Sequence, residues 1–183
     1  MKKTTALEMN RLSIEEYRNA EKLPLIVVLD DVRSLYNVGS VFRTSDAFRV
    51  EAIYLCGITA TPDSSLKASQ EIHKTALGAE DTVMWRYFKD ATEAVESLKK
   101  EGYKVLAIEQ CHGSTMLHDY CFKKEKTAIV LGNEVKGVSQ PVIDICDGHI
   151  EIPQFGTKHS LNVSVTAGII IHHIFSVLGL QEQ

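Results

Sequence analysis

The sequence predicts an α/β fold, with a mostly parallel sheet and helices on both of its faces. Apolar runs of strand length alternate with segments of helical periodicity along most of the chain, which is the pattern of strand–helix units. The apolar runs are continuous, as in strands that are buried on both sheet faces. The 183 residues, of which 44% are hydrophobic, suit one domain with a good-sized core. We expect an N-terminal helical extension at 1–22 and a single domain at 23–183.

A short helix and a buried strand open the predicted element order. Residues 13–22 have a capping-box pattern, with Ser13 as the N-cap and Glu16 three residues later. Pro24 is expected to end this helix, because proline cannot continue the hydrogen-bond pattern. The run LIVVLD at 25–30 then has the length and composition of a buried strand.

A second helix and a second strand follow. Apolar residues at helical spacing predict a helix over 38–50, with Asn37 as its N-cap. The run AIYLCGI predicts a strand at 52–58. Residues 59–70 are polar and show no clear periodicity, so a loop is expected there.

The same alternation continues to the end of the chain. Further strands are predicted at 81–87, 103–109, 127–132 and 149–153, and further helices at 91–102, 138–146 and 160–179. Gly102 provides a stop for the helix at 91–102. The helix at 160–179 is too apolar to present one whole side to water. It is therefore expected in the core or in a subunit interface.

Composition excludes several classes of protein. No apolar run reaches the roughly 18 residues that a membrane span needs, so no membrane partner is expected. The basic start of the chain is not followed by an apolar stretch, which argues against a secretory signal. The four cysteines lie far apart without a CxxC pair, so neither a disulfide framework nor a zinc site is expected. These features together predict a cytoplasmic protein with reduced thiols.

The charge pattern leaves an RNA partner open. The formal net charge of −4 argues mildly against a protein that binds nucleic acid by bulk charge. A local basic surface remains possible from dispersed cations: Lys2, Lys3, Arg11, Arg18, Arg33, Arg43, Lys67, Lys74, Lys123, Lys124 and Lys126.

Three segments that follow predicted strands are rich in Gly, Asn, Ser and charged residues, at 30–48, 131–139 and 152–165. Ligands of a parallel sheet bind in such loops, beyond the carboxyl ends of the strands. None of the three contains GxGxxG or GxxxxGK[ST], which argues against a dinucleotide or phosphate-loop enzyme. The glycines of LGNEVKG suit a backbone that approaches a flat ligand closely, although a plain strand-to-helix turn explains that loop equally well.

Taken together, the three segments closely resemble the motifs of the SpoU (TrmH-like) family of RNA 2′-O-ribose methyltransferases, in the SPOUT superfamily. The first motif is matched by Asn37, Gly39, Arg43, Thr44, Asp46 and Ala47. The second is matched by Leu131, Gly132, Glu134, Gly137, Val138 and Ser139. The third is matched by Ile152, Pro153, Gly156, Ser160, Leu161, Asn162, Val163, Ser164 and Val165, with Thr166 where alanine is common. The likeness spans about Pro24 to Leu178.

The resemblance implies a C-terminal trefoil knot that binds S-adenosylmethionine, and a homodimer whose sites form at the subunit interface. It implies methyl transfer to a ribose 2′-hydroxyl of tRNA or rRNA, with no metal and no DNA partner. Two alternatives stay open: a catalytically inactive RNA- or cofactor-binding module of the same fold, and a methyltransferase that acts on an RNA base.

The resemblance also assigns site residues. Catalytic roles fall to Arg43, Asn37, Glu134, Ser160 and Asn162. Cofactor binding, mostly through backbone groups, falls to Ile108, Glu109, Leu131, Gly132, Asn133, Gly137, Ile152, Pro153, Ser160, Leu161 and Asn162. Free arginine stays protonated and is a poor base, so we expect Arg43 to hold the phosphate beside the target ribose. Glu134 is expected to hold Asn37 or Arg43 in place.

Overall fold

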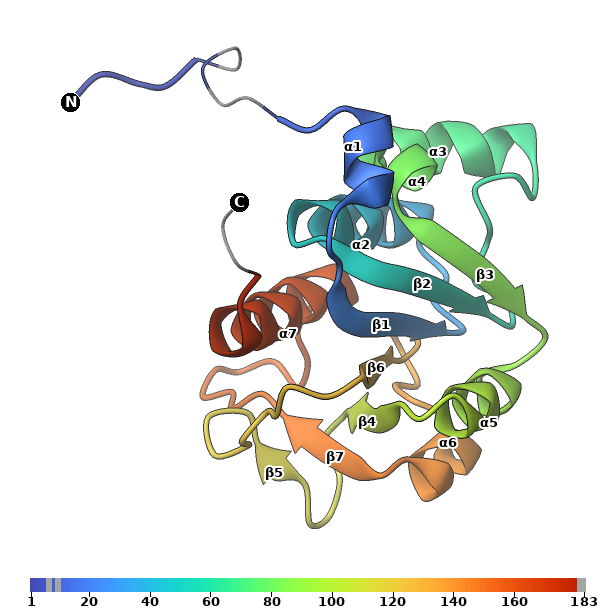
Figure 1. The fold of residues 1–183 in the computed structure, drawn as a ribbon. Coiled ribbons are helices and arrows are strands. Elements are labelled where there is room, and N and C mark those ends of the chain that lie inside the picture. Colours follow the sequence, from blue (N-terminus) through green and yellow to red (C-terminus); the bar gives the residue numbers. More distant parts are fainter. Residues whose placement is uncertain (6–7, 9–10, 181–183) are drawn as a thin grey trace.

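The computed structural model describes residues 1–5, 8 and 11–180, so residues 6–7, 9–10 and 181–183 of the two predicted ranges 1–22 and 23–183 lie outside the described residues. A seven-stranded sheet forms the centre, in the order β3-β2-β1-β6-β4-β7-β5, and all its strand pairs are parallel (Figure 1). The strands are β1 (Leu23–Asp30), β2 (Val50–Cys56), β3 (Met84–Phe88), β4 (Lys104–Ile108), β5 (Thr115–Met116), β6 (Thr127–Leu131) and β7 (Gly148–Glu151). The predicted mostly parallel α/β fold is confirmed.

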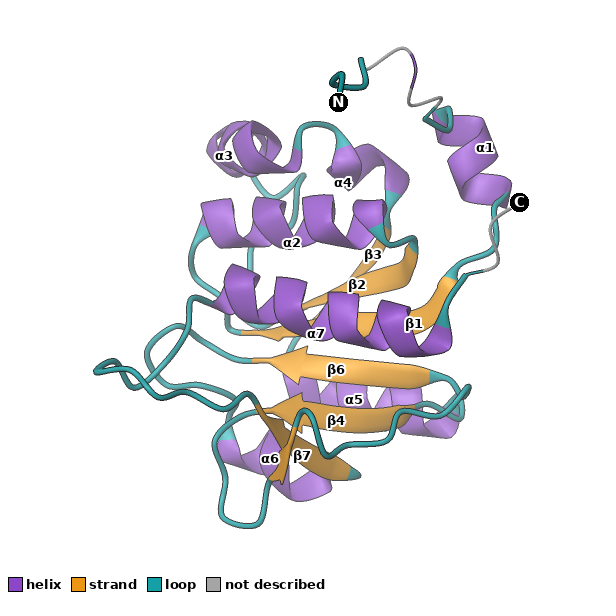
Figure 2. Ribbon diagram, turned by 90° about the vertical axis from the view of Figure 1, so that its left-hand side faces the viewer, coloured by secondary structure: helices purple, strands orange, loops and turns teal. Residues whose placement is uncertain are grey.

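Helices cover both faces of the sheet. They are α1 (Ile14–Asn19), α2 (Leu35–Ala47), α3 (Leu66–Ala76), α4 (Ala79–Thr82), α5 (Ala91–Lys100), α6 (Gln140–Ile145) and α7 (Val163–Leu178). α2 and α7 lie side by side on one face, and α5 and α6 lie on the other (Figure 2). α3 and α4 pack against α2 from outside, and α1 contacts α4. Loops that follow the strands gather at one edge of the sheet (Figure 2).

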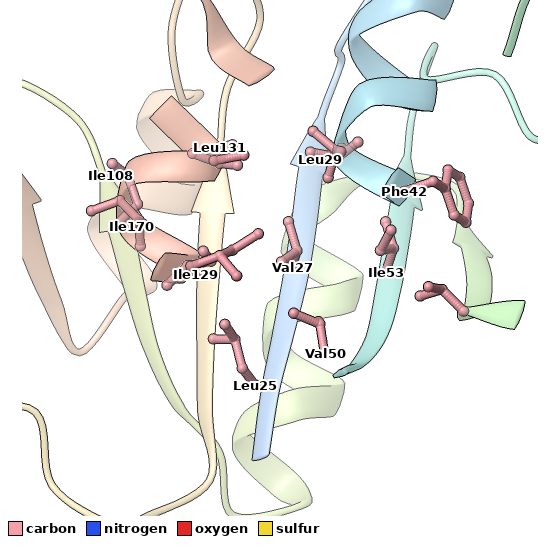
Figure 3. Packing of buried hydrophobic residues seen from close by; sticks show 14 of the residues in the cluster. Leu25, Val27, Leu29, Phe42, Val50, Ile53, Ile108, Ile129, Leu131 and Ile170 are labelled. Atoms are coloured by element: carbon pink, nitrogen blue, oxygen red, sulfur yellow. The ribbon is translucent and has the colours of Figure 1, made fainter. Parts of the chain in front are cut away.

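Side chains of β1 alternate between two apolar cores. Leu25, Val27 and Leu29 pack toward the face that α2 and α7 cover (Figure 3). Ile26 and Val28 pack toward the α5 and α6 face. Each of these five side chains is at most 2% exposed, which explains why the strand is apolar at every position from Leu25 to Leu29 rather than at alternate ones.

At the start of the chain, one prediction is confirmed and two need correction. The capping box of α1 is confirmed, because Ser13 accepts from the Glu16 backbone and Glu16 accepts from the Ser13 backbone. The helix ends at Asn19, however, before the predicted end at residue 22. Pro24 does not end it and instead lies inside β1, where the pairing with β2 shifts register between Leu23 and Ile26. Proline is tolerated at such a strand start or bulge because no ladder donor is needed there.

Ser34, not Asn37, is the N-cap of α2. Its side chain accepts from the Asn37 backbone N–H at 3.3 Å, so the helix begins one turn earlier than predicted. Asn37 therefore lies in the first turn, and its side chain is available for other contacts.

The loop predicted at 59–70 is helical in its last part. Ser65 caps α3 by accepting from the Ala68 backbone, and Ala68, Ile72 and Ala76 form its buried stripe. This stripe, spaced by four residues, was the missed signal. The two-residue strand β5 is also additional to the prediction, because so short a segment has no recognisable periodicity.

Among the described residues, no helix combines the length and apolarity that crossing a membrane requires. The division into an extension at 1–22 and a domain at 23–183, and the trefoil knot, stay predictions.

Candidate active site

A cleft of about 490 Å³ lies at the sheet edge where β4, β6 and β7 end. Ten residues predicted to bind a cofactor line it: Ile108, Glu109, Leu131, Gly132, Asn133, Gly137, Ile152, Ser160, Leu161 and Asn162. Glu134 also lines it, whereas Pro153 and Arg43 do not. The cleft brings together the loops at 131–139 and 152–162, which are distant in sequence.

Two glycines shape the loop after β6. Backbone bonds in both directions pair Asn133 with Gly137, at 3.0 and 2.9 Å. This pairing brings the chain so close that a Cβ on Gly132 would lie 2.0 Å from the Gly137 carbonyl carbon. Gly137 has a φ of +69°, and its Cβ would lie 2.1 Å from Glu109 Oε2. Only glycine fits at either position.

Three side chains fix this loop to neighbouring strands. Asn133 Nδ2 donates to the Asp31 carbonyl oxygen at 2.7 Å, and the Ser139 N–H donates to Asp30 Oδ2 at 2.9 Å. On the other side, the Val138 N–H donates to Glu109 Oε2 at 2.9 Å. Asp30 and Asp31 are missing from the predicted site, although paired aspartates directly after a buried strand were an available signal.

A hydrogen-bond network links all three sequence motifs at the mouth of the cleft. Asn37 Nδ2 donates to Glu134 Oε1 at 3.0 Å, and Asn162 Nδ2 donates to Asn37 Oδ1 at 3.1 Å. Glu134 also accepts from the backbone N–H groups of Arg33 and Ser34, each at 3.0 Å. The carboxylate thus orients Asn37, which in turn contacts the start of α7.

Glu134 is held in its ionised form. Burial tends to raise its pKa, but hydrogen bonds from the Arg33 and Ser34 backbone and from the Asn37 side chain outweigh that effect. The pKa of Glu134 therefore lies below its ordinary value of 4.5. A carboxylate whose oxygens already accept these donors is suited to positioning rather than to taking up a proton.

Asn162 has two roles that one side chain performs together. Its Oδ1 caps α7 by accepting from the Ser164 and Val165 backbone, while its Nδ2 binds Asn37. Ser160 lies on the cleft wall just before it. The loop is tied to β4 by Gln110, whose Nε2 donates to the His159 carbonyl at 3.0 Å. Gln110 and His159 also line the cleft and were not predicted.

The first motif divides into site residues and packing residues. Arg43 is exposed on α2, and its side chain forms no hydrogen bond or ion pair with any other residue that the structure describes. Glu134 binds Asn37 and not Arg43. Gly39 allows α3 to approach, because its Cβ would lie 2.2 Å from Thr75 Oγ1. Asp46 accepts from Thr82 Oγ1 at 2.6 Å and so holds α4.

Carboxylates predominate over cations in the cleft. Glu109, Glu134 and Glu151 line it, against Lys136 as the one lysine or arginine among its described lining residues. The three carboxylates are held by backbone N–H groups or by the Ser114 hydroxyl. Across the described residues, no group of three or more His, Cys, Asp or Glu side chains is placed to hold a metal ion. The cleft thus favours a cationic or neutral ligand over an anionic one.

Residues 24–172 match the model of the SpoU rRNA methylase family. The chain belongs to this family. It is 31% identical over 163 residues to the 23S rRNA (guanosine-2′-O-)-methyltransferase RlmB of Neisseria meningitidis, covering 88% of this chain and 62% of the relative. A putative TrmH family tRNA/rRNA methyltransferase of Staphylococcus haemolyticus is 31% identical over 162 residues, with the same two coverages. The chain therefore spans 62% of the length of these relatives.

Solved structures support the same family. The TrmH/SpoU tRNA modifying enzyme of A. aeolicus superposes with a TM-score of 0.77 at 25% identity, over 90% of this chain and 81% of that one. The AdoMet-bound rRNA methyltransferase of Sinorhizobium meliloti gives 0.76 at 25% identity, over 88% and 60%. The resemblance inferred from three short motifs is thus confirmed over most of the chain.

Proposed function

We propose that the protein transfers a methyl group from S-adenosylmethionine to a ribose 2′-hydroxyl of tRNA or rRNA. The network of Glu134, Asn37 and Asn162 carries this proposal, because it joins α2, which bears the exposed Arg43, to the mouth of a cleft of small-molecule size. The relatives named above, which act on RNA according to their names, support it.

The cleft suits S-adenosylmethionine in size and charge. Its volume of about 490 Å³ is that of a small-molecule site. Its acidic lining favours a positively charged sulfonium and disfavours an anionic dinucleotide. When bound, the cofactor supplies a methyl group on a positively charged sulfur.

Cofactor-binding groups are assigned by the same proposal. Backbone groups of Gly132, Ile152 and Leu161 hold the adenosine. The neighbouring positions assigned to the same site are Ile108, Glu109, Leu131, Asn133, Gly137, Pro153, Ser160 and Asn162. Pro153 does not line the cleft, so its contribution is to fix the path of the chain beside Ile152.

Side chains of α2 bind and orient the RNA. Arg43 binds the phosphate next to the target ribose through its planar guanidinium, and any base role of Arg43 depends on that contact. Asn37 orients the ribose. Glu134 acts as a positioning residue, since its carboxylate fixes the Asn37 amide.

We further propose a homodimer that forms through α7. Leu117, Val165, Gly168, Ile169, His172 and His173 line an apolar groove along this helix. Val165 is 50% exposed and Ile169 is 37% exposed. Apolar side chains that remain exposed in a contiguous groove are typical of a protein interface.

Product analysis tests the proposal. The protein is incubated with methyl-labelled S-adenosylmethionine and total RNA, and the RNA is then digested to nucleosides. A labelled 2′-O-methyl nucleoside is the expected result. A methylated base would instead support a base methyltransferase, and absence of product despite cofactor binding would support an inactive binding module.

A further inference from the structure

An exposed tyrosine precedes Asn37 in the first turn of α2. Tyr36 is 50% exposed, yet its backbone is firmly held. Its carbonyl oxygen accepts from Thr75 Oγ1 at 3.0 Å and from Ser40 Oγ at 2.8 Å. Because Gly39 lets α2 and α3 approach closely, Tyr36 is placed on a rigid support beside the catalytic network.

Charged groups of α3 lie beside Tyr36. Glu71 is the largest cause of a Tyr36 pKa that lies above its ordinary value. The same carboxylate pairs with Lys74 Nζ at 2.6 Å. Lys74 first, and Tyr36 second, lower the pKa of Glu71. The backbone of Tyr36 is thus held by α2 and α3, while half of the residue's surface stays open.

Two rows of polar residues meet at Tyr36. On α2, Tyr36, Ser40 and Arg43 recur at intervals of four and three residues and share one helix face. On α3, Lys67, Glu71 and Lys74 recur at the same intervals. Lys67, Lys74 and Arg43 are exposed, and Lys74 neutralises Glu71. The surface is therefore locally basic, although the chain as a whole carries a net charge of −4.

An open aromatic ring next to exposed cations is the chemistry that binds single-stranded nucleic acid. Bases stack on aromatic rings, and lysine and arginine contact the phosphates. A tyrosine whose movement is already restricted loses little conformational freedom on binding.

We propose that Tyr36 is a stacking platform for the base of a nucleotide next to the target ribose, and that Lys74 and Lys67 contact the phosphates beyond it. The partner is a single-stranded segment of RNA, such as a loop, that crosses from α2 to α3. This inference rests on the proposed function, because it uses Asn37 and Arg43 as the position of the target.

The test separates stacking from a structural role of Tyr36. Binding of a short fluorescein-labelled single-stranded RNA of mixed sequence is measured by polarisation, and S-adenosylmethionine affinity by calorimetry. The variants are Tyr36→Leu, Tyr36→Phe, Lys74→Ala and, as a matched control, Tyr87→Leu. Tyr87 is 53% exposed on β3, and its hydroxyl donates to the Gly57 carbonyl rather than to α2 or α3.

Tyr36→Leu is expected to weaken RNA binding about tenfold or more, since stacking on one aromatic ring contributes on that order. Tyr36→Phe and Tyr87→Leu are expected to bind like the wild type, and Lys74→Ala to reduce the salt dependence of binding. Unchanged cofactor affinity in every variant shows that the fold is retained.

Equal RNA binding by Tyr36→Leu and the wild type overturns the inference, and so does a Tyr36→Phe variant as weak as Tyr36→Leu. The second result would assign the effect to the hydroxyl and Glu71. Failure of the proposed function has a different signature: the wild type then binds RNA in a Tyr36-dependent way but yields no 2′-O-methyl nucleoside.

Discussion

The α2 side of the site and the cleft side are built by different means. On α2, the groups proposed to act on the RNA are side chains of a regular helix, namely Tyr36, Asn37 and Arg43. On the cleft side, loops after β4, β6 and β7 present largely backbone, and glycines bring that backbone close. A regular helix fixes the directions in which side chains point, whereas the backbone of an irregular loop can follow the outline of a small ligand.

Because the two sides are built differently, mutations should separate cofactor binding from methyl transfer to the RNA. Changes on α2 should impair methyl transfer while leaving cofactor affinity intact. Changes that move the loop backbone should remove cofactor affinity and, with it, transfer. Glu134 and Asn162 join α2 to the cleft, so their variants should lose part of the methyl transfer and part of the cofactor affinity.

The largest effect is expected for Gly132→Ala. The added Cβ overlaps the Gly137 backbone at 2.0 Å, so the 131–139 loop must move and close the cleft. We expect no measurable S-adenosylmethionine binding by calorimetry. Gly156→Ala is the matched control, because its Cβ meets nothing within 4 Å. Equal binding by the wild type and Gly132→Ala would show that this loop does not shape the cofactor site.

A glutamate at Ile169 should disrupt the proposed dimer. Ile169 lines the groove on α7, and a buried unpaired charge there is strongly unfavourable. Ile169→Glu is expected to be a monomer by light scattering and to lose transfer. Met84→Glu places the same charge on β3, where Met84 is 63% exposed, and should change nothing. If the Ile169→Glu variant is still a dimer, the interface does not form through α7.

A smaller effect is expected for Asn37→Ala. The substitution removes the contacts to Glu134 and Asn162, whereas Asn37 itself does not line the cleft. Misplacing the ribose should lower kcat roughly a hundredfold, with S-adenosylmethionine affinity preserved. If kcat stays at the wild-type value, Asn37 has no positioning role.

The smallest effect concerns stability and pH. Glu134→Gln weakens the bonds to the Arg33 and Ser34 backbone, at a cost of about 1 kcal/mol for an exposed group. Because the folded-state pKa is lowered, the stabilisation is present above pH 4.5 and is lost as pH falls through the folded-state pKa. The difference in Tm between variant and wild type should shrink over that range.

Glu96→Gln is the control for that measurement, since the Glu96 carboxyl makes no hydrogen bond within the part of the chain that the structure describes. A Tm difference for Glu134→Gln that is independent of pH would contradict the account of this carboxylate.

The strands were largely predictable, because continuous apolar runs are local signals, whereas the cleft residues were assigned from the family resemblance. Ten of the assigned cofactor positions line the cleft. Contacts that depend on tertiary packing were not predictable: Gly39 is needed for α3 to approach, and Asp30 is needed to anchor Ser139. Only the N-cap prediction for Asn37 was wrong, since Ser34 caps α2. The bond from Asn37 to Glu134, 97 positions away, was expected from the family resemblance and not from any local pattern.

Arg43 provides the most direct test of the division between α2 and the cleft. S-adenosylmethionine affinity and methyl transfer to RNA are measured on the same preparation of Arg43→Ala, with Arg43→Lys as the variant that keeps the charge but loses the planar fork. We expect Arg43→Ala to bind the cofactor like the wild type and to transfer no methyl group, with partial transfer by Arg43→Lys. Undiminished transfer by Arg43→Ala, or joint loss of transfer and cofactor binding, would contradict this division of roles.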